Sequence, residues 1–104
     1  MSAIINIGLI TSGGAAYSPL AALAALADAG VQVLTSIVRQ SDSEPTLVVE
    51  LAAPLTALQL HAVAVACHQD AVAQLDANTI GTLEGPGADK WRPFNIEYFL
   101  TFEE

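Results

Sequence analysis

The run Leu55–Val72 contains no glycine or proline and no charged residue before Asp70. Pro54 precedes it, and Thr56 followed by Gln59 has the form of a capping box, in which two side chains satisfy two free amides where a helix begins. The run therefore predicts one helix. Because a helix that is apolar nearly all round must be covered on more than one side, this segment constrains the fold most.

Two stripes of residues follow the helical repeat along this run. The first, which we expect to face the core, consists of Leu60, Val63, Ala64, Cys67 and Ala71. The second consists of Leu58, His61, Val65 and His68. It holds neither Lys nor Glu, which an ordinary surface helix would carry there. We therefore expect the second stripe to lie under another element or to face a partner.

A second helix is expected over Pro19–Ala29, with Ser18 as its N-cap and Gly30 as its left-handed C-cap. Its expected core face consists of Leu20, Leu23, Leu26 and Ala27. Its other face consists of Ala21, Ala22, Ala25, Asp28 and Ala29. That alanine-rich face either reflects helix propensity alone or lets another backbone come close.

The remaining segments predict strands. Ala3–Thr11 has apolar residues on both faces, which is typical of a central strand. Val31–Arg39 and Thr46–Ala52 are separated by a short polar turn and predict an antiparallel hairpin. Ala73–Leu83 forms either one bent strand or a short hairpin whose second arm is Thr79–Leu83.

The order strand, helix, strand, strand, helix, strand predicts a ferredoxin-like βαββαβ fold. In this α+β fold, two helices cover one face of a four-stranded antiparallel sheet. The other face would be bare and would show apolar residues such as Ile4 and Ile10. We expect a single domain over residues 1–104, with residues 90–104 as an aromatic tail.

Charged residues make up 13% of the chain, against about 25% in a typical domain. Three cations and eleven anions cannot cover the surface of a small domain, so apolar area stays exposed. Such area usually marks an interface, which predicts a homo-oligomer or a protein partner. The net charge of −8 argues against direct nucleic-acid binding and against an anionic membrane surface, because both need cations.

Cys67 is the single cysteine, so no intrachain disulfide forms, and its place in the first stripe predicts a buried thiol. No basic residue precedes Ile4, as a signal peptide would require. No apolar run reaches the ~18 residues that a membrane span needs. We expect a cytoplasmic protein without a cofactor.

The loop Thr11–Tyr17 joins the first expected strand to the first helix. Glycine-rich amides beside a helix N-terminus bind anions in many proteins, but this loop matches neither the dinucleotide nor the Walker pattern. It is either a plain connection or the site of a small-molecule sensor for an anion or amino acid. The ligand-binding candidates are Ser12, Gly13, Gly14 and Ser18.

His61 and His68 are seven residues apart, which places them about two turns, ~10.5 Å, from each other on one helical face. That separation is too long for one metal ion, so no metal site is predicted. Adjacent helical residues point about 100° apart, so Cys67 and His68 do not form a catalytic pair. An enzyme whose site is shared between subunits remains an alternative.

The segment Lys90–Phe102 holds all the aromatic residues except Tyr17. Trp, Tyr and Arg often dominate protein interfaces. The tail therefore either closes the core of its own domain or forms a recognition arm. The interface candidates are Trp91, Arg92, Phe94, Tyr98 and Phe99, together with His61 and His68.

The leading hypothesis is a non-enzymatic, acidic protein-interaction module. It would form a homo-oligomer and bind a partner through the bare sheet face and the aromatic tail. In its small size, acidity and lack of catalytic motifs the chain resembles accessory proteins of phages and mobile elements, and an inhibitor of a host or competing system would fit the acidity. The alternatives are the small-molecule sensor and the enzyme with a shared site.

Overall fold

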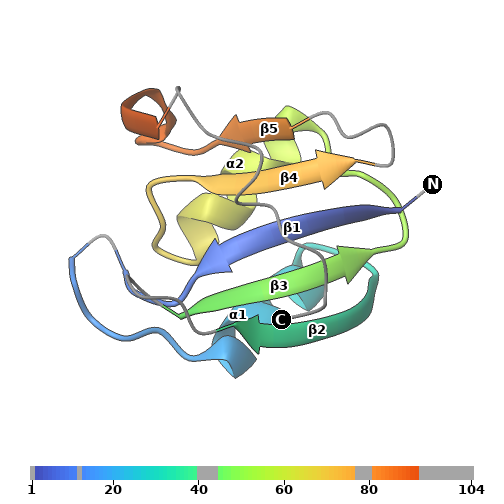
Figure 1. Ribbon diagram of the computed structural model, residues 1–104, viewed down its shortest axis with the longest axis horizontal. Coiled ribbons are helices and arrows are strands. Elements are labelled where there is room, and N and C mark those ends of the chain that lie inside the picture. Colours follow the sequence, from blue (N-terminus) through green and yellow to red (C-terminus); the bar gives the residue numbers. More distant parts are fainter. Residues whose placement is uncertain (1, 12, 40–44, 77–80, 92–104) are drawn as a thin grey trace.

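The computed structural model has two layers, one formed by two short α-helices and the other by a sheet of strands (Figure 1). The structure describes residues 2–11, 13–39, 45–76 and 81–91, without the side chains of the last two. Its elements in chain order are β1 (Ala3–Gly8), α1 (Pro19–Asp28), β2 (Val33–Arg39), β3 (Thr46–Leu51), α2 (Ala57–Ala66), β4 (Val72–Asp76), β5 (Gly81–Glu84) and the 3-10 helix η1 (Ala88–Trp91).

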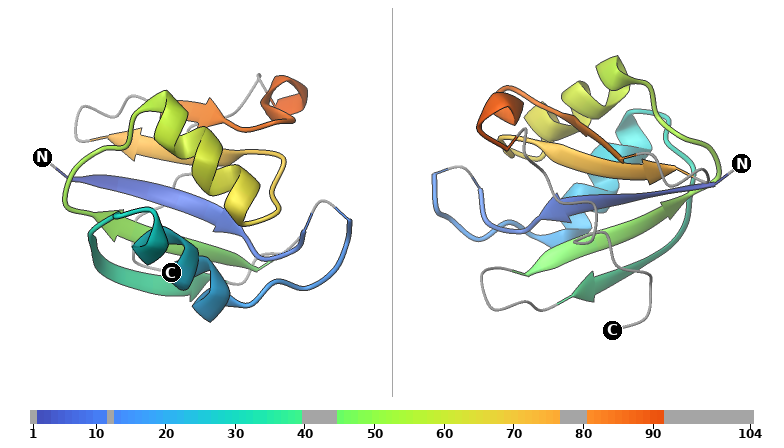
Figure 2. Two further views of the ribbon diagram at one scale, coloured as in Figure 1. Left: turned by 180° about the vertical axis from the view of Figure 1, so that it is seen from behind. Right: turned by 45° about the horizontal axis from the view of Figure 1, so that its top comes forward.

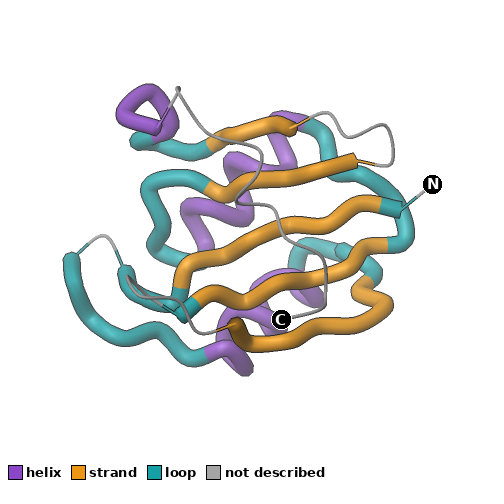
Figure 3. The backbone as a smooth tube through the Cα atoms, in the orientation of Figure 1, coloured by secondary structure: helices purple, strands orange, loops and turns teal. Residues whose placement is uncertain are grey.

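The strands form one antiparallel sheet in the order β2-β3-β1-β4-β5 (Figure 3). The predicted four-stranded ferredoxin-like βαββαβ fold is therefore wrong, because the sheet of this α+β fold has five strands. The additional strand is β5, which pairs with β4 from Val72 opposite Glu84 to Leu75 opposite Gly81. Of the two interpretations of this region, the hairpin is confirmed, and residues 77–80 lie outside the described part.

The two α-helices, α1 and α2, lie on the same face of the sheet (Figure 2). Burial alternates along β1, where Ala3, Ile5 and Ile7 are buried and point toward the helices. The core cluster between the layers joins the strands to both helices. Its members are Ile5, Ile7, Leu9, Ala22, Leu26, Leu47, Val49, Leu51, Leu60, Val63, Ala64, Cys67 and Val72.

The long helix is shorter than the sequence predicts. It ends at Ala66, with Cys67 as its C-cap, and His68 has a left-handed φ of +56°. The His68 amide donates to the Val65 carbonyl and the Gln69 amide to the Ala64 carbonyl, which together form a Schellman motif. The sequence predicts a longer helix because this motif usually carries a glycine, and a histidine at position 68 gives no signal that the helix ends.

The beginning of α2 is fixed by side chains. The predicted capping box of Thr56 and Gln59 is confirmed, with both of its hydrogen bonds present. Just before it, the buried Gln74 side chain of β4 accepts from the Leu55 amide at 2.9 Å and donates to the Leu55 carbonyl at 3.0 Å. These bonds tie the helix to the sheet.

The buried side of α1 differs from the predicted one. Ser18 caps the helix as expected, but the fully buried residues are Ala22 and Leu26, whereas Leu20 is 77% exposed. The predicted core face is therefore wrong at Leu20 and at Ala27, which is also exposed. Leucine and alanine occur on all sides of this helix, so the apolar pattern alone does not predict which side faces the sheet.

The face of the sheet opposite the helices, which we call the second sheet face, is not bare at its centre. Leu47 and Val49 point to the helices, so Val48 between them lies on the second face. Val48 is nevertheless 0% exposed, and Ala73 on the same face is 5% exposed. The prediction of a bare face is thus wrong at these positions.

The turn after β5 packs closely on the segment before β4. Gly85 has a φ of +153°, and a Cβ on it would meet the Asp70 carbonyl oxygen and lie 2.7 Å from the Ala71 Cα. We expect Gly85→Ala to lower the free energy of unfolding by roughly 2–5 kcal/mol, the sum of backbone strain and overpacking. Urea denaturation measures this loss.

The matched control is Gly30→Ala at the end of α1. Gly30 also has a positive φ, +76°, but no atom lies within 4 Å of the position that a Cβ would take there. This variant should lose only the cost of left-handed backbone, about 1–2 kcal/mol. Equal losses for the two variants would contradict the close packing at Gly85.

Candidate functional site

Three amides of the first loop, those of Thr11, Gly14 and Ala15, donate hydrogen bonds within the loop. Ile10 and Ala16 form an antiparallel bridge, and the Thr11 amide donates to the Ala15 carbonyl at 2.7 Å. The Gly14 amide donates to the Thr11 carbonyl, and the Ala15 amide donates to Thr11 Oγ1. These three amides are therefore not free to bind an anion.

The predicted ligand-binding residues fall into three situations. Gly13 and Gly14 are exposed at the tip of the loop, where Gly14 has a φ of +90°. Ser18 Oγ accepts from the Ala21 amide at 3.4 Å, so it serves as the helix cap. Ser12 lies outside the described residues. A ligand at this loop stays a prediction.

The two histidines do not share a helical face, because the helix ends between them. His61 lies exposed in α2, whereas His68 follows the C-cap. The prediction of one common face is therefore wrong. No group of three or more His, Cys, Asp or Glu side chains that could hold a metal ion occurs among the residues the structure describes.

His68 belongs to a junction between α2 and the first loop. The Tyr17 ring meets the His68 ring edge to face, with centroids 5.7 Å apart, and Tyr17 Oη donates to the Ala66 carbonyl at 3.4 Å. Gln69 is buried and donates from Nε2 to the Ile10 carbonyl at 2.9 Å. These contacts position the first loop against the end of α2.

Cys67 is fully buried in the core, as predicted. Burial raises the pKa of its thiol to about 11. The thiolate is the nucleophilic form, so a thiol that stays protonated at neutral pH is a poor nucleophile. This environment gives Cys67 a structural role and lends no support to cysteine-based catalysis.

The outer stripe of α2, which we define as Leu58, His61, Ala62 and Val65, is the clearest candidate site. All four residues are exposed, with Leu58 at 80% and Val65 at 53%. No described element covers the stripe, so the prediction that it lies under another element is wrong, and contact with a partner stays a prediction. The whole of α2 is uncharged, and α1 beside it carries only Asp28.

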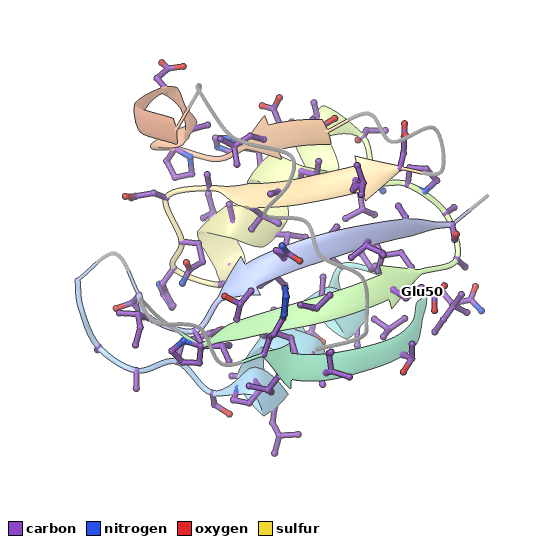
Figure 4. All side chains as sticks on the ribbon, in the orientation of Figure 1. Glu50 is labelled. Atoms are coloured by element: carbon purple, nitrogen blue, oxygen red, sulfur yellow. The ribbon has the colours of Figure 1, made fainter. Side chains whose placement is uncertain are left out.

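The second sheet face differs from this helix layer in charge. Glu50 of β3, labelled in Figure 4, is half-buried on that face, because its neighbours Val49 and Leu51 point into the core. Arg39 of β2 is also half-buried. Two copies that met through this face would have to place both of these charges in the interface, whereas the helix layer carries only Asp28.

Of the aromatic tail, residues 90–104, the structure describes only the backbone of residues 90 and 91. The backbone of η1 ends at Trp91 beside β5. The Trp91 side chain and the predicted interface residues Arg92, Phe94, Tyr98 and Phe99 lie outside the described part, so an interface formed by them stays a prediction. No helix in the described ranges combines the length and apolar character needed to cross a membrane.

Comparison of the chain with protein-family models, with curated proteins and with solved structures finds no match. The hypothesis of an inhibitor from a phage or mobile element therefore stays a prediction. Any functional argument has to come from the surfaces of the molecule itself.

The buried thiol predicts a loss of stability in alkali. Below pH 9.0, the ordinary pKa of the thiol, both the folded and the unfolded chain keep the Cys67 proton. Between pH 9.0 and about 11 only the unfolded chain loses it, so stability should fall by about 1.4 kcal/mol per pH unit from this group. Urea denaturation across this range measures the slope.

Cys67→Ala is the matched control, because tyrosine and lysine also titrate in this range. The variant is less stable at every pH, but its stability should fall less steeply above pH 9.0 than that of the wild type. Identical slopes for the variant and the wild type would show that burial does not keep the Cys67 thiol protonated above pH 9.0.

Proposed function

We propose that this chain is a non-enzymatic protein-interaction module that acts as a homo-oligomer through its helix layer. The observation that supports this most is the exposed, uncharged outer stripe of α2. An isolated surface helix normally carries charged residues on its outer side. A helix that lacks them gains from contact with protein.

The charge of the chain favours a second copy as the occupant of this surface. Two chains of net charge −8 repel wherever their carboxylates meet. The outer stripe presents none, and Asp28 is the single charge on the helix layer formed by α1 and α2. A two-fold interface places the same patch of both copies in contact, so an uncharged patch is self-compatible.

The apolar side chains on this layer are large enough to matter. Full burial of a leucine or valine side chain contributes about 1.5–3 kcal/mol. Each copy contributes the exposed side chains of Leu58 and Val65, and Leu20 of α1 adds a further exposed leucine. Alanines along α1 allow a neighbouring backbone to approach closely.

The catalytic and sensor alternatives gain no comparable support. The thiol of Cys67 is buried and protonated, and the loop amides near Gly14 are paired internally. Neither place combines an accessible reactive group with a converging set of polar side chains.

We predict that Val65→Glu disrupts the oligomer, because it places a carboxylate in the middle of each interface. Light scattering after size-exclusion chromatography should give the wild type at least twice the chain mass of 10.8 kDa. The variant should elute at the monomer mass at the same concentration.

Leu34→Glu is the matched control. Leu34 lies in β2 and is 53% exposed, the same fraction as Val65, but it is not part of the helix layer. This variant should keep the wild-type mass. A monomeric wild type, or the same change in both variants, would contradict self-association through the helix layer.

A further inference from the structure

The outer stripe of α2 is symmetrical about its own midpoint. Leu58 and Val65 form its ends, and His61 and Ala62 lie next to each other at its centre, so the two ends are equally far from that centre. The ends are seven residues apart, which is about 10.5 Å along the helix. A stripe of this form can face an inverted copy of itself with every position matched.

We propose that α2 pairs antiparallel with the α2 of a second copy, about a two-fold axis that passes between His61 and Ala62. The inference rests on the proposed function and adds the contacting element, its direction and its register. Leu58 then faces the partner's Val65, and His61 faces the partner's Ala62. Each facing pair combines a larger side chain with a smaller one, which lets the surfaces of two helices interdigitate.

The antiparallel direction fits the stripe better than the parallel one. In a parallel pair each residue faces its own counterpart, so the two His61 imidazoles would meet, and so would the two Ala62 methyl groups. The ends of the two helices that carry like partial charges would also lie side by side. The antiparallel pair avoids both, because each end of α2 lies beside the opposite end of its partner.

Between the two helices of the layer, α2 is the better centre for the contact. The exposed side of α1 has one leucine, Leu20, and otherwise consists of alanines such as Ala24 and the charged Asp28. The exposed side of α2 has Leu58 at 80% and Val65 at 53% and carries no charge. An axis through α2 therefore buries more apolar area and leaves Asp28 outside the centre of the contact.

The pairing also sets the number of copies. A two-fold contact uses the same patch on both chains, so it closes after two copies and leaves no stripe free for a third. Because α1 and α2 lie on the same face of the sheet (Figure 2), the two helix layers meet in the middle of the dimer. The two sheets then form its outer layers.

Disulfide cross-linking of the full chain tests the register. Chains with Leu58→Cys and chains with Val65→Cys are mixed in equal amounts under reducing conditions and then oxidised. About half of the dimers in a random mixture contain one chain of each kind, so the linked dimer should approach half of the chains. Intact mass spectrometry identifies it. Each variant alone should stay unlinked, because its two cysteines lie about 10.5 Å apart along the pair, too far for a disulfide.

Three comparisons complete the cross-linking experiment. The unmodified chain should give no linked dimer, because Cys67 is fully buried. His61→Cys mixed with Ala62→Cys repeats the test at the centre of the stripe, should cysteine at an end weaken the dimer. Ala24→Cys, at an exposed alanine of α1, should not link to Leu58→Cys.

The contradicting outcomes separate this proposal from the proposed function. Light scattering should give the wild type twice the chain mass of 10.8 kDa. A larger oligomer, or a dimer in which neither mixed pair links, would overturn the antiparallel α2 pair and leave self-association standing. Self-linking of Leu58→Cys would show a parallel pair, and a link from Leu58→Cys to Ala24→Cys would place α2 against the partner's α1; either result overturns the proposal. A monomeric wild type would overturn both.

Discussion

The fold depends on burying one side of α2 against the sheet. Leu60, Val63, Ala64 and Cys67 pack on the strands, and hydrogen bonds hold both ends of the helix in place. The capping box and Gln74 fix its beginning, and the Schellman motif with His68 in the left-handed region fixes its end. A ten-residue helix is marginal alone, so these contacts and the core decide where it lies.

The same helix explains the proposed function. Because its sequence is apolar on nearly all sides, burying the inner stripe leaves Leu58 and Val65 exposed. Most of the carboxylates lie elsewhere in the chain, and the helix layer carries only Asp28. The second sheet face, in contrast, combines a buried centre at Val48 with the half-buried Glu50. Contact between copies is therefore least opposed by charge on the helix side.

Local signals predicted the structure well, and signals that depend on distant contacts did not. The capping box of Thr56 and Gln59 and the Ser18 cap follow from residues three apart, so the sequence reveals them. The rotation of α1 was missed because leucine and alanine are both apolar. The end of α2 was missed because His68 adopts a backbone conformation usual for glycine. The strand β5 is short, and its pairing with β4 across residues 77–80 has no strong local signal. The outer stripe was recognisable from its missing charges, but only the structure shows that it is exposed.

The most direct test of the central claim is whether the outer stripe becomes covered as the chain associates. Hydroxyl-radical footprinting, read by mass spectrometry at low and high protein concentration, measures the accessibility of individual side chains. The account predicts that Leu58, His61 and Val65 become protected at high concentration, whereas Leu34 on the edge strand keeps its labelling. Labelling of all four residues that does not change with concentration would contradict the account.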